Sequence, residues 1–468
     1  MATAIVWFRD DLRLSDNPAL QAALRAGYAP VPVYIHAPEE EGPWAPGAAS
    51  DAWRRRSLQA LDARLRQRGS RLQVFAGPSL STLQRVAAAC DAEAVFWNRR
   101  YEPTIEQRDA AIKRELRGAG LRAESHNAAL LFEPWQIQSR QGDPYRVFTP
   151  FWRTALAQWR MPACTEPPPT LPEPGSIAGS TSVDELLAAP TPAWDTGFWH
   201  QWTPGEAGGE QALRLFADDA VRDYTDARDR PALRGTSRLS PHLHFGELSP
   251  WRIVRALEGA PVDEREAYVR QLGWREFAHH VLHHFPHTQD ANFDARFDGF
   301  DWNALPEAHR QAWQQGRTGV PLVDAGMREL WATGWMHNRV RMVVASFLGK
   351  NLRAHWLEGA RWFWQTLVDA DLANNGLGWQ WVCGTGVDAA PYVRVFNPTL
   401  QAQRFDPQGA YIARWLPGFD RLPVALRHEP WRDAEAVKSA APDYPRSPIV
   451  DLAASRQAAL EAFSRSRK

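Results

Sequence analysis

The first 125 residues alternate short apolar runs with amphipathic stretches, and this alternation constrains the fold more than any other feature. Five runs have the length and apolar character of buried strands, and stretches of helical periodicity separate them. The runs cover residues 5–8, 31–35, 72–76, 94–98 and 121–125. Because strands that are joined through helices pair in parallel, the segment predicts an α/β domain with a parallel five-stranded sheet.

Local signals in this segment agree with such a domain. Asn17 suits the N-cap of a helix, Pro18 suits its first position, and Gly27 ends it. Neither G-x-G-x-x-G after the first strand nor G-x-x-x-x-G-K-[ST] occurs. We therefore expect a Rossmann-like domain over residues 1–130 that does not bind nucleotides through either of these motifs.

The second half of the chain has a different pattern. A proline-rich stretch at residues 165–175 (TEPPPTLPEPG) is typical of a stiff connector, and we place an inter-domain linker over residues 131–200. After Glu210 the strand signals almost disappear, which predicts an all-α domain over residues 201–468. Its predicted helices cover residues 211–222, 250–258, 263–284, 307–315, 321–333, 336–348 and 361–368.

Composition excludes several classes of protein. Lys+Arg and Asp+Glu both number 54, so any contact with DNA must come from a local basic patch. Three cysteines exclude a four-cysteine metal centre, argue against a disulfide scaffold and fit a reducing cytoplasm. No run of 18 apolar residues or signal peptide is visible, so we expect no membrane contact. The 23 tryptophans, against 9 tyrosines, favour a large planar ligand or electron transfer.

Several long motifs follow one another along the chain. They are WFRDDLR at 7–13, TSRLS at 236–240, WREF at 274–277, GWMHNRVRM at 334–342, DADLANN at 369–375, GWQW at 378–381 and AAPYVRVFNP at 389–398. In this combination the sequence resembles the photolyase/cryptochrome family, most closely its class I cyclobutane pyrimidine dimer DNA photolyases. The resemblance runs from residue 4 to about residue 430.

This resemblance implies a blue-light flavoprotein whose helical domain holds FAD. The repairing members bind DNA that contains a pyrimidine dimer and flip the dimer into a cavity over the flavin. Excited reduced flavin donates an electron, the cyclobutane ring splits and the electron returns. As an enzyme the chain would be a deoxyribodipyrimidine photo-lyase, a carbon–carbon lyase that acts in DNA repair as a cytoplasmic monomer.

The resemblance also carries the family's FAD contacts onto this sequence. Arg341 and Asp369 match an ion pair beside the flavin ring, and Asn375 matches the residue that faces flavin N5. The TSRLS motif matches the phosphate-binding segment. The full set is Tyr224, Thr236, Ser237, Arg238, Leu239, Ser240, Arg275, Arg341, Asp369, Asp371 and Asn375.

Two further groups of residues carry over. One is the tryptophan chain that brings electrons to oxidised flavin, and it comprises Trp302, Trp356 and Trp379; the other tryptophans are expected to pack the core. The second is the DNA and lesion site. Its apolar wall is Trp274 and Trp381, its other edges are Asn338 and Met342, and its phosphate-facing cations are Arg228, Arg339 and Arg394.

Gln271 departs from the family pattern. The repairing members carry a glutamate three residues before the tryptophan of WREF, and its carboxyl group contacts the dimer and can share a proton. The Gln271 amide can donate a hydrogen bond but cannot release a proton. Two hypotheses stay open: a photolyase whose repair survives Gln271, or a cryptochrome-like protein that binds FAD and DNA without efficient repair. Asn338 stands where the (6-4) branch needs a histidine, which argues against (6-4) repair.

Three further expectations complete the analysis. We expect a folate antenna, although Thr104-Ile105 replace the Asn-Glu pair of the family's folate site. The histidines of HHVLHHFPH at 279–287 lack a clear third ligand, so no metal is expected. The chain ends close to the matched region, without the long tail of many cryptochromes, which favours the enzyme.

Overall fold

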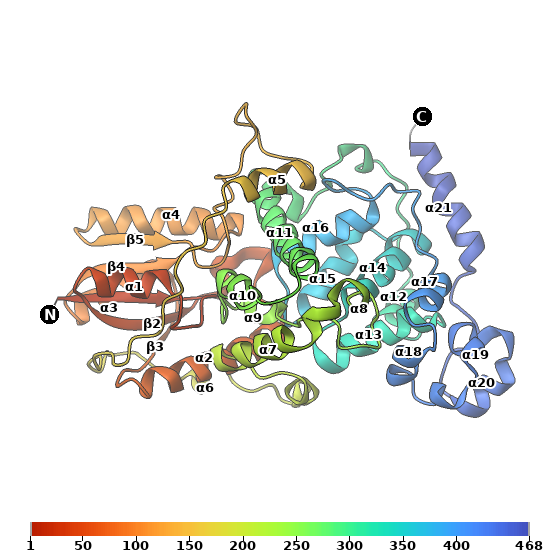
Figure 1. The fold of residues 1–468 in the computed structure, drawn as a ribbon, viewed down its shortest axis with the longest axis horizontal. Coiled ribbons are helices and arrows are strands. Elements are labelled where there is room, and N and C mark those ends of the chain that lie inside the picture. The colour runs from red at the N-terminus through yellow and green to blue at the C-terminus, as the bar shows by residue number, and fades with distance from the viewer. Residues whose placement is uncertain (1, 467–468) are drawn as a thin grey trace.

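Five parallel strands form one sheet at the N-terminal end of the molecule, as the sequence predicts (Figure 1). The structure is a computed structural model that describes residues 2–466. The strands are β1 (Thr3–Phe8), β2 (Ala29–His36), β3 (Gln73–Ala76), β4 (Ala92–Asn98) and β5 (Arg122–His126). They lie in the order β3-β2-β1-β4-β5, so β1 is central, and its residues from Ala4 to Phe8 are buried.

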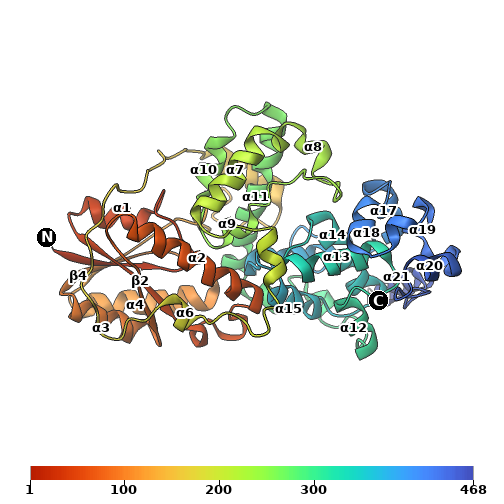
Figure 2. The same cartoon turned by 90° about the horizontal axis from the view of Figure 1, so that it is seen from below.

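Helices cover both faces of this sheet (Figure 2). The covering helices are α1 (Pro18–Arg25), α2 (Ala48–Arg66), α3 (Ser79–Ala89) and α4 (Pro103–Gly118). Val6 and Phe8 pack with α1 and α2, whereas Ile5 and Trp7 pack with α3 and α4. This split follows from the alternation of side chains along a strand. The predicted cap of α1 is confirmed, because the Asn17 side chain accepts a hydrogen bond from the Leu20 N–H.

The segment after β5 runs back along the N-terminal domain before it enters the helical part. It contains α5 (Phe148–Ala157) and α6 (Val183–Leu186). The proline-rich stretch is anchored to the sheet domain, since Leu171 N donates to Arg68 O at 2.8 Å and Thr181 N donates to Val74 O at 2.8 Å. The domain boundaries given above stay predictions.

The rest of the chain is helical, as the sequence predicts. Its α-helices are α7 (Glu206–Asp218), α8 (Tyr224–Ala227), α9 (Ser240–His244), α10 (Pro250–Ala256), α11 (Val262–His284), α12 (Glu307–Gln314), α13 (Pro321–Thr333), α14 (Asn338–Ser346), α15 (Trp356–Thr366), α16 (Leu372–Cys383), α17 (Pro398–Phe405), α18 (Ala410–Trp415), α19 (Val424–His428), α20 (Ala434–Ala440) and α21 (Leu452–Ser466). A short π-helical turn, η6 (Phe347–Asn351), continues α14. None of the helices within residues 2–466 is long and apolar enough to cross a membrane.

Some helix boundaries differ from the predictions. Helix α15 starts five residues before the predicted 361, and α7 starts five residues before the predicted 211. Helix α16 was not predicted, because Gly376 and Gly378 lower its helical propensity. It forms in the fold because it packs against α11, α14 and α15, which bury Trp379 among other residues. Tertiary packing therefore overrides local propensity in this segment.

The two halves of the molecule pack closely against each other. Helix α2 of the sheet domain contacts α15 of the helical domain. The Trp364 indole N–H donates to Ala45 O at 2.7 Å, and a Cβ atom at Gly47 would stand 2.1 Å from Trp364 O. Glycine is thus required at Gly47 for the close approach of the two domains.

Candidate functional site

The TSRLS segment lies between α8 and α9 and holds a half-buried arginine, Arg238. Arg238 has a left-handed backbone with a φ of 55°, and its guanidinium lies over the rings of Trp335 (4.8 Å) and Trp202 (5.5 Å). Its Nη1 donates to Gln201 Oε1 at 3.3 Å. No carboxylate among residues 2–466 forms an ion pair with Arg238, and burial lowers its pKa. A half-buried cation without an ion-pair partner favours the binding of an anion.

The hydroxyl groups beside Arg238 are also arranged to donate. Ser237 Oγ accepts hydrogen bonds from the Tyr268 hydroxyl (3.0 Å) and the Leu239 N–H (3.3 Å), and Ser240 Oγ accepts one from the Trp335 indole (3.2 Å). In these contacts both serines are acceptors, which leaves their own protons to donate to a ligand. Leu239 is buried beneath the segment, and Thr236 is half-buried.

Tyr224 lies at the start of α8, next to this segment. Its ring packs against Tyr268 of α11 at 5.3 Å and is buried. Gly235 allows α8 to approach the TSRLS segment, because a Cβ atom there would stand 2.5 Å from the backbone of Ala227. The predicted contacts Tyr224 and 236–240 are therefore brought together in space.

The predicted ion pair forms between α14 and the segment that precedes α16. Arg341 Nη2 donates to both carboxylate oxygens of Asp369, at 2.8 and 3.0 Å, and its Nε donates to Met336 O at 2.7 Å. The Asp369 side chain is 3% exposed. Arg341 also lies 5.9 Å from the Trp335 ring, so one indole connects the ion pair to the Arg238 segment.

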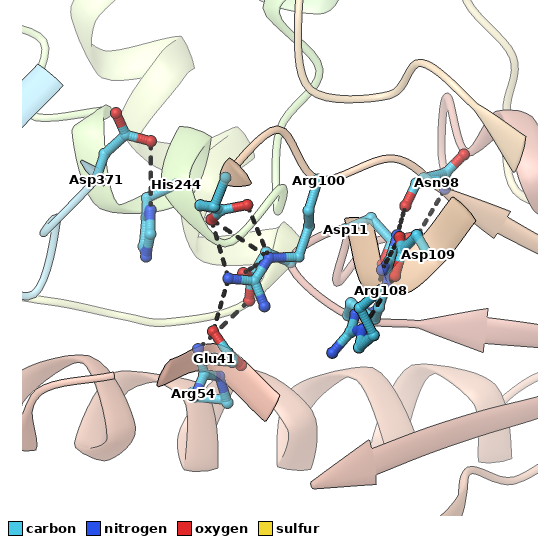
Figure 3. A network of polar contacts seen from close by, with 12 residues as sticks. Asp11, Glu41, Arg54, Asn98, Arg100, Arg108, Asp109, His244 and Asp371 are labelled. Atoms are coloured by element: carbon cyan, nitrogen blue, oxygen red, sulfur yellow. Dashed lines mark hydrogen bonds and ion pairs between the residues drawn. The ribbon is translucent and has the colours of Figure 1, made fainter. Parts of the chain in front are cut away.

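Asn375 and Asp371 stand at the start of α16. The Asn375 side-chain amide donates to Ala360 O at 2.9 Å, which fixes the orientation of its carbonyl oxygen. Asp371 is the N-cap of α16, and its Oδ1 accepts from the Asn374 N–H at 2.8 Å. Its Oδ2 lies 3.5 Å from His279 Nε2. The same oxygen lies 3.9 Å from His244 Nδ1 (Figure 3).

The electrostatics of Asp371 follow from these histidines. Burial alone would raise the pKa of Asp371, but the charge of His279, the hydrogen bonds with His244 and His279 and the charge of Arg275 together hold the pKa well below its usual range. The pKa of His279 is raised by the same pair, despite the burial of its ring. Arg275, one turn before His279 on α11, donates to Ala129 O at 2.7 Å.

The donor set fits the predicted cofactor. A diphosphate needs several N–H and O–H donors with a cation, and Arg238, Ser237 and Ser240 supply them. The rings of Trp335 and Tyr268 border this cradle, and Arg341 offers a fixed positive charge 5.9 Å from the Trp335 ring. Sequence reasoning missed Trp335, Tyr268 and Trp202 as parts of the cradle. Trp335 does lie inside the GWMHNRVRM motif, and this position could have indicated it.

The residues predicted to contact a lesion lie mainly on α11 and α14. Gln271 Oε1 accepts a hydrogen bond from Arg228 Nη2 at 3.0 Å, and its Nε2 donates to Ala267 O at 3.1 Å. Trp274, one turn further, stacks on Phe148 of α5 with ring centroids 3.9 Å apart. Both groups of the Gln271 amide are therefore engaged within the protein, and the wall residue Trp274 is held rigidly.

The remaining predicted DNA contacts are partly exposed. Asn338 begins α14 and is exposed, with its amide 3.9 Å from Met342 Sδ on the next turn. Arg339 pairs with Asp229 at 2.6 Å, so it is not a free cation. Trp381 is half-buried on α16, and Arg394 is exposed in the loop that follows α16.

The predicted tryptophan chain has unequal contacts. Trp379 packs on Gly359, one turn after Trp356 on α15, and a Cβ atom there would stand 2.0 Å from its ring. Trp302 reaches Trp356 through His355, whose ring lies 5.3 Å from Trp302 and 5.6 Å from Trp356. Trp379 also contacts Trp313 (6.3 Å), a residue that sequence reasoning assigned to the core.

A second polar network lies at the carboxyl ends of β1 and β2 (Figure 3). Arg100 forms ion pairs with Glu41 (2.8 Å) and Asp10 (3.1 Å), and Arg54 lies 3.6 Å from Asp10. Although burial would raise it, the nearby arginines lower the pKa of Asp10 to about 2. This network includes Asp10 of the WFRDDLR motif. It surrounds a small cavity bordered by Trp7 and His36.

The expected folate contacts are less well formed. Tyr101 donates its hydroxyl proton to Glu133 at 2.9 Å, while Ile105 is buried in the apolar core beneath α4. Ile105 thus offers no polar group at the position where the family's folate binders carry glutamate. The expectation of a folate finds no support in the structure or in the relatives described next. Residues 2–466 contain no group of three or more His, Cys, Asp or Glu side chains that could hold a metal ion.

Comparison with known proteins agrees with this arrangement. Residues 268–465 match the family described as the FAD binding domain of DNA photolyase, and residues 4–173 match the family described as DNA photolyase. A deoxyribodipyrimidine photo-lyase of Agrobacterium fabrum is 42% identical over 100% of this chain and 98% of its own length. Cryptochrome-1 of Arabidopsis thaliana is 39% identical over 98% of this chain and 70% of its own length.

Solved structures show the same similarity. A bacterial class III photolyase from Agrobacterium tumefaciens has a TM-score of 0.95 with 42% identity, covering 100% of this chain and 98% of that chain. An archaeal photolyase from Sulfolobus tokodaii, solved with two FAD molecules, has a TM-score of 0.84 with 30% identity, covering 99% and 100%. A photo-lyase and a cryptochrome thus resemble this chain in sequence, and two photolyases share its fold. The chain belongs to the photolyase/cryptochrome family.

Proposed function

We propose that the chain binds FAD in the helical domain and repairs pyrimidine dimers in DNA under blue light. The observation that carries the proposal is the role of Trp335. This indole joins Arg238, which forms no ion pair within residues 2–466, and the Ser240 hydroxyl to the Arg341–Asp369 pair. A phosphate cradle and a fixed cation thus both lie close to one aromatic side chain.

The residues of this chain have distinct roles in the proposed reaction. FAD, when bound and reduced, supplies the light absorption and the electron. Arg238, Ser237 and Ser240 bind its phosphates, and Arg341 places a positive charge beside the flavin ring. Asp369 holds Arg341 in position and offsets its charge, which makes the burial of the guanidinium tolerable.

Other side chains would act on the DNA. Trp274, stacked on Phe148, offers a rigid apolar wall for a flipped pyrimidine. Arg228 and Arg394 offer positive charge to phosphates, which a chain of zero formal net charge needs locally. Gln271 would meet the dimer only after its contacts with Arg228 and Ala267 are exchanged.

This last observation favours a second candidate function. The Gln271 amide cannot release a proton, and both of its polar groups already have protein partners. A cryptochrome-like protein that binds FAD and DNA without efficient repair would have these properties. The relatives include both classes, namely the photo-lyase of Agrobacterium fabrum and Cryptochrome-1 of Arabidopsis thaliana.

The subclass also stays a proposal. Sequence motifs favour class I photolyases, whereas the solved relative with 42% identity is a class III photolyase. We propose as the reaction the cyclobutane dimer repair that the resemblance to class I photolyases implies. A cytoplasmic, monomeric protein remains the expectation from the sequence.

The deciding experiment measures light-driven repair of an oligonucleotide with one thymine dimer. Wild type and Gln271→Glu are photoreduced and compared at equal FAD content, which is determined from flavin absorbance. Gln457→Glu serves as the matched control, because Gln457 is exposed on α21 and the substitution changes the net charge equally.

Each outcome is informative. Efficient repair by wild type establishes a photolyase in which Gln271 suffices. Repair by Gln271→Glu alone establishes a photolyase scaffold that Gln271 disables. FAD binding without repair by any variant supports the photoreceptor, and failure to bind FAD refutes the whole proposal.

A further inference from the structure

A buried lysine that none of the proposed roles uses lies behind the DNA-facing loop. Lys350 is completely buried in the π-helical turn η6, which follows α14. Its ammonium group donates to the backbone oxygen of Arg394 at 2.8 Å and lies 5.3 Å from the centre of the Tyr392 ring. Burial of a lysine is rare unless the charge has a specific partner.

The surroundings of Lys350 offer no negative charge. No carboxylate among residues 2–466 pairs with Lys350, and its remaining charged or titratable neighbours are Cys383 of α16, Arg394 and Tyr392. Burial raises the pKa of the Cys383 thiol to about 12, so this neighbour is neutral. Burial, with a smaller contribution from Arg394, lowers the pKa of Lys350 to about 8. The Arg394 carbonyl is therefore the principal polar partner of the ammonium group.

The loop that Lys350 contacts is also held by other hydrogen bonds, among them one from the Arg394 N–H to Pro391 O at 2.9 Å. Its backbone is held by Ser346, whose Oγ accepts from the Phe396 N–H at 3.2 Å. The Tyr392 ring is buried in an aromatic cluster with Phe297 and Phe300. Between these fixed points the Arg394 side chain is exposed. The main chain thus faces the protein while the guanidinium faces solvent.

We infer that Lys350 is a positioning residue that holds the Arg394 backbone so that its guanidinium can bind a DNA phosphate. The inference rests on the proposed function, because it takes DNA as the partner of Arg394. Its physical basis is the charge-assisted hydrogen bond from an ammonium group to a carbonyl in a site closed to bulk solvent, which is stronger than a neutral one. Lys350 acts through Arg394 and does not touch DNA.

The test is a double-mutant cycle on DNA affinity. Dissociation constants for a duplex with one thymine dimer are measured for wild type, Lys350→Met, Arg394→Ala and the double variant. Lys350→Met and Arg394→Ala should each weaken binding about tenfold, and the double variant should be no weaker than Arg394→Ala alone. Each should also lower the salt slope of log affinity by about 0.9.

A matched control separates positioning from charge. Lys438→Met removes one positive charge from the exposed face of α20 and should leave the affinity within about twofold of wild type. Ser346→Ala, which removes another anchor and keeps the charge, should weaken binding in the same direction as Lys350→Met. FAD content and the melting temperature show that the variants are folded.

The pH dependence of DNA affinity distinguishes a positioning lysine from a purely structural one, because a purely structural lysine would not change it. The affinity of wild type should fall between pH 7 and pH 9, with a midpoint near the Lys350 pKa of about 8. Lys350→Met should lack this transition. Wild-type affinity in Lys350→Met, or a tenfold loss that persists in the Arg394→Ala background, overturns the inference. DNA binding too weak to measure in wild type instead overturns the proposed function and this role with it.

Discussion

The contact between Gly359 and Trp379 allows one quantitative prediction. In α15, a Cβ atom at Gly359 would stand 2.0 Å from Cη2 of the Trp379 ring and 2.5 Å from two further ring atoms. Ordinary contact begins at 3.4 Å, so Gly359→Ala requires a separation of the two helices or a tilt of the indole by 1.4 Å. Trp379 is 2% exposed and cannot move without displacing its neighbours.

The energetic effect has two parts of opposite sign. Overpacking of a close-packed core costs about 1–3 kcal/mol. Replacement of glycine by alanine inside a helix stabilises it by about 1 kcal/mol. Gly359→Ala should therefore lower the free energy of unfolding by up to about 2 kcal/mol.

Gly378 supplies a matched control for the helical part of this effect. It lies in α16, and a Cβ atom there meets no atom within 4 Å. Gly378→Ala should stabilise the protein by about 1 kcal/mol, so the difference between the two variants isolates the overpacking cost.

Urea unfolding followed by tryptophan fluorescence measures both variants. A second readout is the photoreduction of oxidised FAD, which should slow in Gly359→Ala while chemical reduction stays unchanged. Equal unfolding free energies for Gly359→Ala and Gly378→Ala would refute the argument, because they would show that Trp379 does not pack tightly against α15.

Three further predictions concern buried carboxylates. Asp369→Asn should cost about 1–3 kcal/mol of unfolding free energy and lower the FAD retained after gel filtration, since it leaves Arg341 without its partner. Asp371→Asn should destabilise most between about pH 4 and pH 6.5. Below that range the ion pair between Asp371 and His279 is lost because the carboxylate becomes protonated. Above that range the ion pair is lost because the pH rises through the raised pKa of His279. Urea midpoints at pH 5.5 and pH 8.5 check this. Glu276→Ala should cost about 2–4 kcal/mol in the same assay, because two backbone N–H groups after β5 lose their acceptor, and Glu276→Gln should cost less.

Much of the architecture could be predicted from local patterns. The five strands and the Asn17 cap were identified from apolar runs and capping residues, and the predicted helix at 321–333 coincides with α13. Such signals act within a few residues and need no knowledge of the rest of the chain. Helix α16 was not predicted from the sequence, because its stability comes from packing against three neighbouring helices and not from its own sequence.

The residues of the candidate site were likewise predicted only in part from the sequence. Motif resemblance selected Arg238, Arg341 and Asp369, and the structure brings them near one indole. The same motif contained Trp335, but nothing in its sequence position indicates that it would contact Ser240, 95 residues earlier. No sequence pattern indicated that Lys350 is buried, because a lone lysine in a helical stretch is ordinarily exposed.

The sequence by itself determined that an α/β domain precedes a helical domain and that the chain belongs to this family. It also determined which types of side chain are available to bind a flavin and DNA. Only the tertiary structure decided which of those groups are paired. Arg339 is neutralised by Asp229, Arg228 is bound to Gln271, and Lys350 is buried against Arg394. The physical reason is that strand and helix signals are local, whereas the charge and orientation of a side chain depend on partners that packing brings from distant parts of the chain.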